Sequence, residues 1–153
     1  MLRRSIGLAL GSLFVLALSA APTQAQYQNI DAVGGPGVGE QTILTISPHR
    51  LNADLSARAL GIKSPRRASQ WALTLIGADP DAEIGLRLGK DTLSVDRISR
   101  PEDGPGPVQV YMTEQTFLTL ADSPMARLVV DGTRVSLPKV LRQEMQVIFD
   151  RVT

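Results

Sequence analysis

The chain has 153 residues, of which 43% are hydrophobic and 20% are charged, a composition typical of a folded domain. Its formal net charge of +1 excludes a broadly basic nucleic-acid-binding protein. The sequence contains no cysteine, which excludes disulfide bonds, thiolate catalysis and cysteine-based metal sites.

Residues 1–25 have the three-part layout of a secretory signal peptide. Arg3 and Arg4 precede an apolar run over residues 6–18, and Thr23-Gln24-Ala25 supplies small residues before a cleavage site. The apolar run is too short to span a bilayer comfortably. We therefore expect export to the periplasm or the extracellular medium, with no transmembrane segment after cleavage. Cleavage would remove two arginines and no acid, which changes the net charge from +1 to −1.

Residues 26–41 are expected to form a flexible, glycine-rich tail. The stretch Gly34-Gly35-Pro36-Gly37-Val38-Gly39 favours neither a helix nor a central strand. It does not resemble a dinucleotide-binding loop, because no strand pattern precedes it and no helix pattern follows it. Residues 42–153 are then expected to form a single α+β domain.

The first part of this domain predicts a strand, a short helix and a second strand. Residues 42–47 are β-branched and partly alternating, and Ser47-Pro48 is typical of a helix start. Helical spacing then continues to Gly61, which could end the helix. The apolar positions are Leu51, Leu55, Ala59 and Ile62. Residues 70–77 alternate around Trp71 and predict a central strand, followed by a turn over 78–82.

Two short turns predict β-hairpins. Gly89-Lys90 suits a type II′ turn, and Asp131-Gly132 suits a type I′ turn. Both registers place apolar side chains on one face, and a shift of one residue would reverse every side chain. The first hairpin pairs Leu86 with Leu93, Arg87 with Thr92 and Ile84 with Val95. The second pairs Val130 with Thr133, Leu128 with Val135 and Ala126 with Leu137.

The remaining segments predict a loop, a strand and two helices. Residues 100–107 are rich in proline and glycine and form the loop, and residues 108–112 form the strand. Thr113 can cap a short helix over 114–121. A last helix begins near Pro138, and its apolar stripe comprises Leu141, Met145, Ile148 and Val152. We therefore expect an α+β fold with one antiparallel sheet of about six strands. A short helix and a long C-terminal amphipathic helix would cover one face of this sheet.

The sequence contains few patterns that indicate a catalytic site. His49 is the single histidine of the sequence, and the pattern gives it no catalytic partner, so a surface or capping role is favoured. Asp79, Asp81 and Glu83 have the spacing that begins a calcium loop, but the later glycine and glutamate of an EF-hand are missing. A solvated turn is favoured over a weak, hydrated cation site. No catalytic residue, cofactor or metal site is assigned.

The segment 49–67 has the largest local excess of positive charge. Its basic residues are Arg50, Arg58, Lys63, Arg66 and Arg67, against the single acid Asp54. These residues are candidates for a patch that contacts an anion, such as a phosphate-rich envelope lipid or another acidic partner. The alternative is a solvated helix and loop. Because no aromatic residues are interleaved, stacking with single-stranded nucleic acid has no support.

Tyr111 is the sixth candidate binding residue. Trp71, Tyr111 and Phe117 could line a groove, although core packing is the default role of such residues. Tyr111 alternates with the apolar residues of the strand 108–112. If those residues face the core, Tyr111 lies on the open face of the sheet.

These features favour an exported, non-enzymatic binding or accessory protein whose partner is an unknown protein or envelope component. The first alternative is a small exported hydrolase that uses Asp79, Asp81 and Glu83, or Glu102 and Asp103. The second is an oligomeric structural component, in which a sheet edge or the C-terminal helix pairs with another chain.

Overall fold

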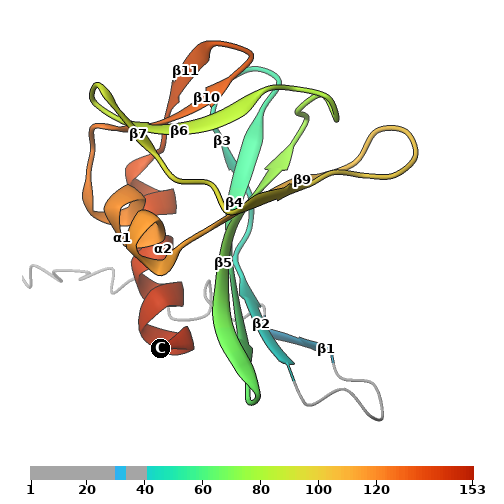
Figure 1. Cartoon of the computed structure of the whole chain (residues 1–153), viewed down its shortest axis with the longest axis vertical. Helices are drawn as coiled ribbons and strands as arrows, with labels where there is room; N and C mark the ends of the chain where they lie inside the picture. The colour runs from blue at the N-terminus through green and yellow to red at the C-terminus, as the bar shows by residue number, and fades with distance from the viewer. Residues whose placement is uncertain (1–29, 34–40) are drawn as a thin grey trace, which may run out of the picture.

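The computed structural model describes residues 30–33 and 41–153 (Figure 1). The elements in chain order are β1 (Ile30–Val33), β2 (Gln41–Thr45), β3 (His49–Arg50), β4 (Ser56–Ser64), β5 (Arg67–Ile76), β6 (Ile84–Leu88), β7 (Asp91–Leu93), β8 (Arg97–Ser99), β9 (Val108–Met112), α1 (Glu114–Asp122), β10 (Ala126–Val130), β11 (Thr133–Ser136) and α2 (Lys139–Val152). The expected signal peptide lies outside the described residues. Part of the expected tail forms the strand β1, which pairs antiparallel with β2.

The strands form two antiparallel sheets, so the expectation of one sheet is wrong. The larger sheet has the order β1-β2-β4-β5-β9-β8, with β3 also paired to β4, and the smaller sheet has the order β11-β10-β6-β7. The separation arises because β6 pairs with β10 and not with β5. Figure 1 shows both helices on one face of the larger sheet and the smaller sheet at one end. A hairpin pattern identifies only local partners, and pairing between distant strands leaves no such signal.

The two helices begin where the sequence predicts. In α1, Thr113 is the N-cap, and its hydroxyl oxygen accepts a hydrogen bond from the Thr116 backbone N–H at 3.1 Å. In α2, the predicted stripe from Leu141 to Val152 is buried. However, α2 has 14 residues, which is an ordinary length for a globular protein, so the expectation of a long helix is wrong. Neither helix is long and apolar enough to cross a membrane.

The helix predicted after Ser47-Pro48 does not form. This segment contains β3, a turn and most of β4. In the turn, the Asn52 side-chain oxygen accepts from the backbone N–H of Leu55. The spacing of four between Leu51, Leu55 and Ala59 misled the prediction, because it fits a strand of period two as well as a helix.

Both predicted hairpins form in the predicted register. The β6–β7 ladder pairs Leu86 with Leu93 and Arg87 with Thr92, and the β10–β11 ladder pairs Leu128 with Val135 and Val130 with Thr133. Asp131 and Gly132 have φ values of 49° and 79°, as a type I′ turn requires at both central residues. The predicted pairs Ile84–Val95 and Ala126–Leu137 do not form, because β7 ends at Leu93 and β11 ends at Ser136.

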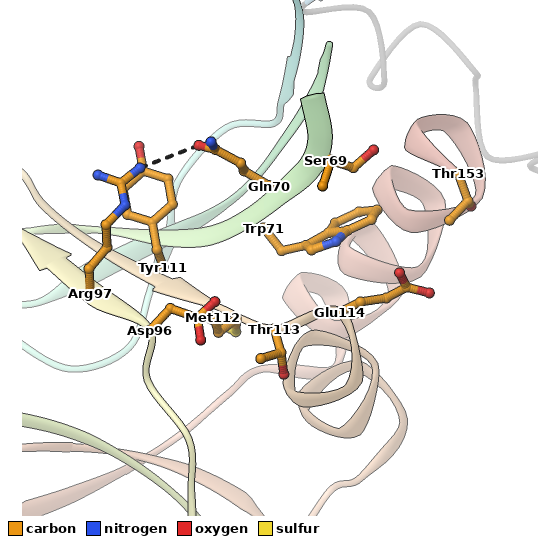
Figure 2. Close-up of a pocket in the computed structure, with 11 residues that line it drawn as sticks. Ser69, Gln70, Trp71, Asp96, Arg97, Tyr111, Met112, Thr113, Glu114 and Thr153 are labelled. Atoms are coloured by element: carbon orange, nitrogen blue, oxygen red, sulfur yellow. Dashed lines mark hydrogen bonds between the residues drawn. The ribbon is translucent and has the colours of Figure 1, made fainter. Parts of the chain in front are cut away.

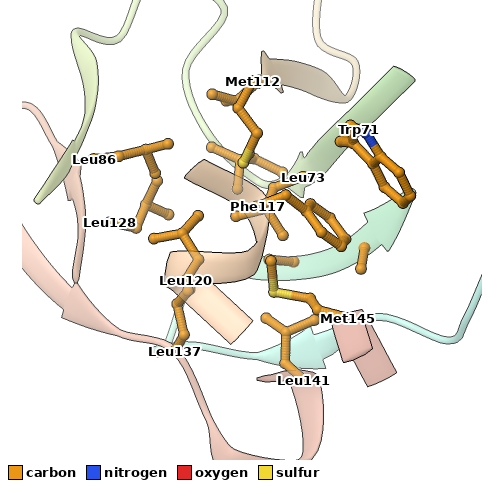
Figure 3. Packing of buried hydrophobic residues seen from close by; sticks show 14 of the residues in the cluster. Trp71, Leu73, Leu86, Met112, Phe117, Leu120, Leu128, Leu137, Leu141 and Met145 are labelled. Atoms are coloured by element: carbon orange, nitrogen blue, oxygen red, sulfur yellow. The ribbon is translucent and has the colours of Figure 1, made fainter. Parts of the chain in front are cut away.

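A single buried cluster connects the two sheets and the two helices. Figure 3 shows side chains from β5, β6, β9, β10, α1 and α2 that pack together; among them are Leu73, Leu86, Met112, Leu120, Leu128, Leu141 and Met145. The packing of α2 against the larger sheet is tight at Gly61 in β4. A Cβ atom there would lie 2.6 Å from Cγ2 of Ile148 and 2.9 Å from Cγ2 of Val152. The absence of a side chain at Gly61 therefore allows this close packing.

The other face of the larger sheet is not covered by the helices. Val108, Val110 and Met112 are buried on the core side of β9, so Tyr111 lies on the open face, as predicted. The loop before β9 is anchored at its start by Arg100. Its guanidinium donates hydrogen bonds to the carbonyl oxygens of Pro80 and Ala82, which lie in the connection between β5 and β6.

Candidate functional site

A pocket of about 440 Å³ lies where β5, β8, β9 and α1 meet; we call it the Tyr111 pocket (Figure 2). Most of its wall comes from the start of β5, the start of β8 and the junction between β9 and α1. Its lining residues that carry polar groups are Ser69, Gln70, Trp71, Asp96, Arg97, Tyr111, Thr113, Glu114 and Thr153. This volume suits a small ligand or a few residues of a peptide.

Arg97 and Tyr111 form one side of the pocket. They are register partners on β8 and β9, and the guanidinium carbon of Arg97 lies 3.6 Å from the centre of the Tyr111 ring. Arg97 also donates to the side-chain oxygen of Gln70 at 3.3 Å. The Tyr111 hydroxyl donates to the side-chain oxygen of Gln109 at 2.8 Å. These contacts hold a cation and an aromatic ring in a fixed arrangement before any ligand arrives.

Trp71 forms the base of the pocket. It is only 2% exposed, and its ring lies between Phe117 and Phe149, with centroid distances of 5.1 and 5.0 Å. Figure 2 shows the indole nitrogen turned toward Thr113 and Glu114. No described residue accepts a hydrogen bond from this nitrogen, which is also not among the fully buried unpaired atoms. Its N–H is therefore available to an acceptor that enters the pocket.

Two carboxylates also line the pocket, those of Asp96 and Glu114. Asp96 precedes β8, and its backbone N–H donates to the Tyr111 carbonyl oxygen at 2.8 Å. Glu114 is the first residue of α1. Both residues are exposed, and neither forms an ion pair with another described residue. The Tyr111 pocket thus presents one positive group, two negative groups and the indole N–H donor of Trp71.

The predicted binding residues do not form one patch. Tyr111 lines the pocket, and Arg58 lies on the same open face, opposite Thr74 on β5. The Nε atom of Arg58 and the hydroxyl of Thr74 are buried and have no hydrogen-bond partner. The other four predicted residues lie toward the two ends of β4, which are about 26 Å apart at the usual rise of a strand. Arg50 is near one end, and Lys63, Arg66 and Arg67 are near the other.

His49 contacts a buried acid outside the pocket. Its Nε2 atom lies 2.8 Å from Oε2 of Glu144, which connects β3 to α2. Burial raises the pKa of Glu144 above its ordinary value, because the charged form is poorly solvated there, and the hydrogen bond and charge of His49 partly oppose this shift. The geometry therefore gives His49 a role in joining two elements.

The clustered acids that the hydrolase alternative requires do not converge. Asp79, Asp81 and Glu83 are exposed, and the side chain of Asp79 accepts a hydrogen bond from the Asp81 backbone N–H. Glu102 and Asp103 are also exposed, in the loop before β9. Within residues 30–33 and 41–153, no group of three or more acidic or histidine side chains could hold a metal ion.

Sequence reasoning missed most of the pocket. It identified Tyr111, but Trp71 was expected to serve in the core, and Arg97 and Asp96 were not considered. Trp71 does pack in the core, but it also lines the pocket. The alternation of Arg97, Ile98 and Ser99 is consistent with a strand, but three residues are too few to distinguish it from a loop.

No protein-family model, curated protein or solved structure matches this chain. The function must therefore be argued from the geometry of the pocket. Groups of both charges around the indole N–H donor of Trp71 suit a polar ligand with its own donors and acceptors. The pocket also adjoins β8, which is an edge strand in the described part of the larger sheet and whose backbone can take part in binding.

Proposed function

We propose that this chain is an exported, non-enzymatic binding protein that holds an extended peptide segment of a partner protein at the Tyr111 pocket. The observation that supports this most is the position of the pocket beside β8. In the described part of the larger sheet, β8 pairs with β9 on one side and with no strand on the other. An extended peptide could add to this edge through main-chain hydrogen bonds.

The pocket would then select the side chains of the peptide. A basic side chain fits between Asp96 and Glu114, and an acidic group fits the guanidinium of Arg97, which is already oriented by Tyr111 and Gln70. The indole N–H of Trp71 suits a peptide carbonyl oxygen. Alternating contacts of this kind are typical of a peptide that lies along a sheet edge.

The export part of the proposal is supported by the layout of residues 1–25 in the sequence. A protein that acts outside the cytoplasm meets partner proteins without a supply of nucleotide cofactors. Recognition of a peptide segment needs no cofactor, so the two parts of the proposal are compatible.

Trp71 provides a direct test because it is the only tryptophan in the sequence and it lines the pocket. A peptide would be selected from a random heptapeptide library on the folded protein, and the synthetic peptide would then be titrated while Trp71 emission is recorded. We expect the emission to shift on binding. Arg97→Gln should weaken binding about tenfold or more, because a charge-assisted hydrogen bond is lost.

Arg66→Gln is the matched control, because it removes the same charge from an exposed position outside the pocket. We expect this variant to bind the peptide as the unmodified protein does. Equal binding by Arg97→Gln, or binding that leaves Trp71 emission unchanged, would reject the pocket as the site. A dimeric mass in light scattering together with no selectable peptide would favour the oligomeric component instead.

A further inference from the structure

The outer face of the smaller sheet carries three arginines on neighbouring strands. Arg87 on β6 is the register partner of Arg127 on β10, so their side chains leave the same face side by side. Arg134 on β11 is opposite Val129, which in turn is opposite Gly85. The core side of these strands is apolar, so all three arginines lie on the side away from the core.

Two of these arginines have no partner in the described part of the chain. Arg127 donates to the carbonyl oxygens of Pro124 and Ala126, at 2.7 and 2.9 Å. Arg87 and Arg134 form no hydrogen bond or ion pair with any described residue. Like charges directly opposite each other on a sheet destabilise it. The pairing of Arg87 with Arg127 therefore has an electrostatic cost that an anion on this face would relieve.

A pocket of about 410 Å³ lies between the two unpaired arginines; we call it the arginine pocket. Its other lining residues are Glu83, Ile84, Gly85, Leu86, Thr92, Val129 and Gly132. Gly85 leaves part of the floor open, because a Cβ atom there would meet nothing within 4 Å. Thr92, the register partner of Arg87, adds a hydroxyl group. Glu83 is the one acid in the lining, and its carboxylate forms no ion pair with either arginine.

We propose that the arginine pocket binds the phosphate group of a soluble phosphomonoester, separately from the Tyr111 pocket. A guanidinium group matches two phosphate oxygens at once, and a hydroxyl can donate to the third. In the lining, Arg87 and Arg134 outweigh Glu83 by one positive charge, and Arg127 and Asp131 add one charge of each sign beside it. A phosphomonoester has three terminal oxygens and about −1.5 to −2 charges at neutral pH, so it can engage both guanidinium groups more fully than a carboxylate, which has two oxygens and one charge.

The test is a titration of the full chain with inorganic phosphate, phosphoserine and acetate, followed by the amide NMR signals of Gly85 and Thr92. We expect both phosphate compounds to shift these signals and to bind about tenfold or more tightly than acetate. Arg87→Gln and Arg134→Gln should each weaken phosphoserine binding by a similar factor. Arg66→Gln, which removes a distant exposed charge, should leave it unchanged.

Gly85→Val is a second variant that retains every charge. Its side chain enters open space and its backbone is in an ordinary strand conformation, so the fold should be retained while the floor of the pocket is filled. We expect it to abolish the phosphoserine shifts. Equal binding of acetate and phosphoserine would overturn the proposal, as would unchanged binding by Gly85→Val and both arginine variants. Binding only to vesicles that contain phosphatidic acid would also overturn it, because the phosphate source would then be a membrane.

Discussion

Glu144 is a carboxylate that the fold keeps largely out of water. Among the described residues, its side chain pairs with His49, whose Nε2 atom lies 2.8 Å from Oε2 of Glu144. Burial raises the pKa of Glu144 above its ordinary value of 4.5 more strongly than His49 lowers it. The native state therefore holds a proton on this group more readily than the unfolded state does. As the pH rises from below 4.5 through the raised native pKa, the unfolded state loses this proton first. Ionisation of Glu144 therefore lowers the free energy of unfolding over this pH range.

The variant Glu144→Gln should remove this pH dependence. Glutamine keeps the shape and a hydrogen-bonding oxygen near His49, but it does not ionise. In urea unfolding between about pH 4 and pH 7, we expect the unmodified protein to lose stability relative to the variant as the pH rises. If the difference in free energy of unfolding between the unmodified protein and the variant stayed constant across this range, burial would not raise the pKa of Glu144 in the native state.

In the candidate site, the position of one residue could be predicted from the sequence and that of another could not. The orientation of Tyr111 was predictable, because the apolar residues on either side of it fix the alternation of β9. Arg97 was not predictable, because its role depends on being the register partner of Tyr111. The two residues are separated by the loop over residues 100–107, and no local pattern in the sequence indicates that the strands on either side of it pair.

The packing of α2 on β4 depends on one position in the strand. Gly61 has Ile148 and Val152 of α2 directly above it, at distances that leave no room for a Cβ atom. Ile148 and Val152 are both buried, so neither side chain can move into open space without disturbing its neighbours. The fit between the strand and the helix is therefore set by the missing side chain.

Gly61→Ala should destabilise the protein by about 1–3 kcal/mol, because the added methyl group forces α2 away from the sheet. Gly85→Ala is the matched control, since it makes the same chemical change in a strand where a Cβ atom meets nothing within 4 Å. We expect the control to be neutral or slightly stabilising. Chemical denaturation of the two variants gives the comparison. An equal effect at both positions would contradict the close contact at Gly61.

Elements with strong local signals were predictable, and elements without them were not. The Asp131-Gly132 turn fixed both the existence and the register of its hairpin, and Thr113 marked the start of α1. In contrast, β4 was mistaken for a helix, because its flanking turn is formed by the Asn52 side chain and its apolar spacing fits both structures. The choice between a helix and a strand there depends on pairing with β5.

At the scale of the whole molecule, both sheets and both helices share one buried cluster. The smaller sheet contributes Leu86 and Leu128, and the larger sheet contributes Leu73. Neither sheet has a separate core within the described residues. The division into two sheets could not be predicted from the sequence, because the local hairpins are compatible with several orders of strands.

The shared core predicts a single cooperative unfolding transition. Trp71 emission reports on one end of the larger sheet, whereas far-ultraviolet circular dichroism reports on both sheets and both helices. We expect the two signals to give the same midpoint in thermal unfolding, because no part of the core can be lost alone. Midpoints that differ would indicate that the smaller sheet unfolds separately.

The pairing of β6 with β10 sets an order for assembly. Ile84 pairs with Val130 and Leu88 pairs with Ala126, so about 40 residues of chain must be available before this ladder can close. A chain that emerges N-terminus first can form the β4–β5 hairpin early, but the smaller sheet has to wait for β10 and β11, and the packing of α2 on β4 has to wait for residues 139–152. Until β10 is synthesised, β6 is paired only with β7 in the smaller sheet. The smaller sheet thus closes only after β10 and β11 have been synthesised, and the chain remains accessible to chaperones until then.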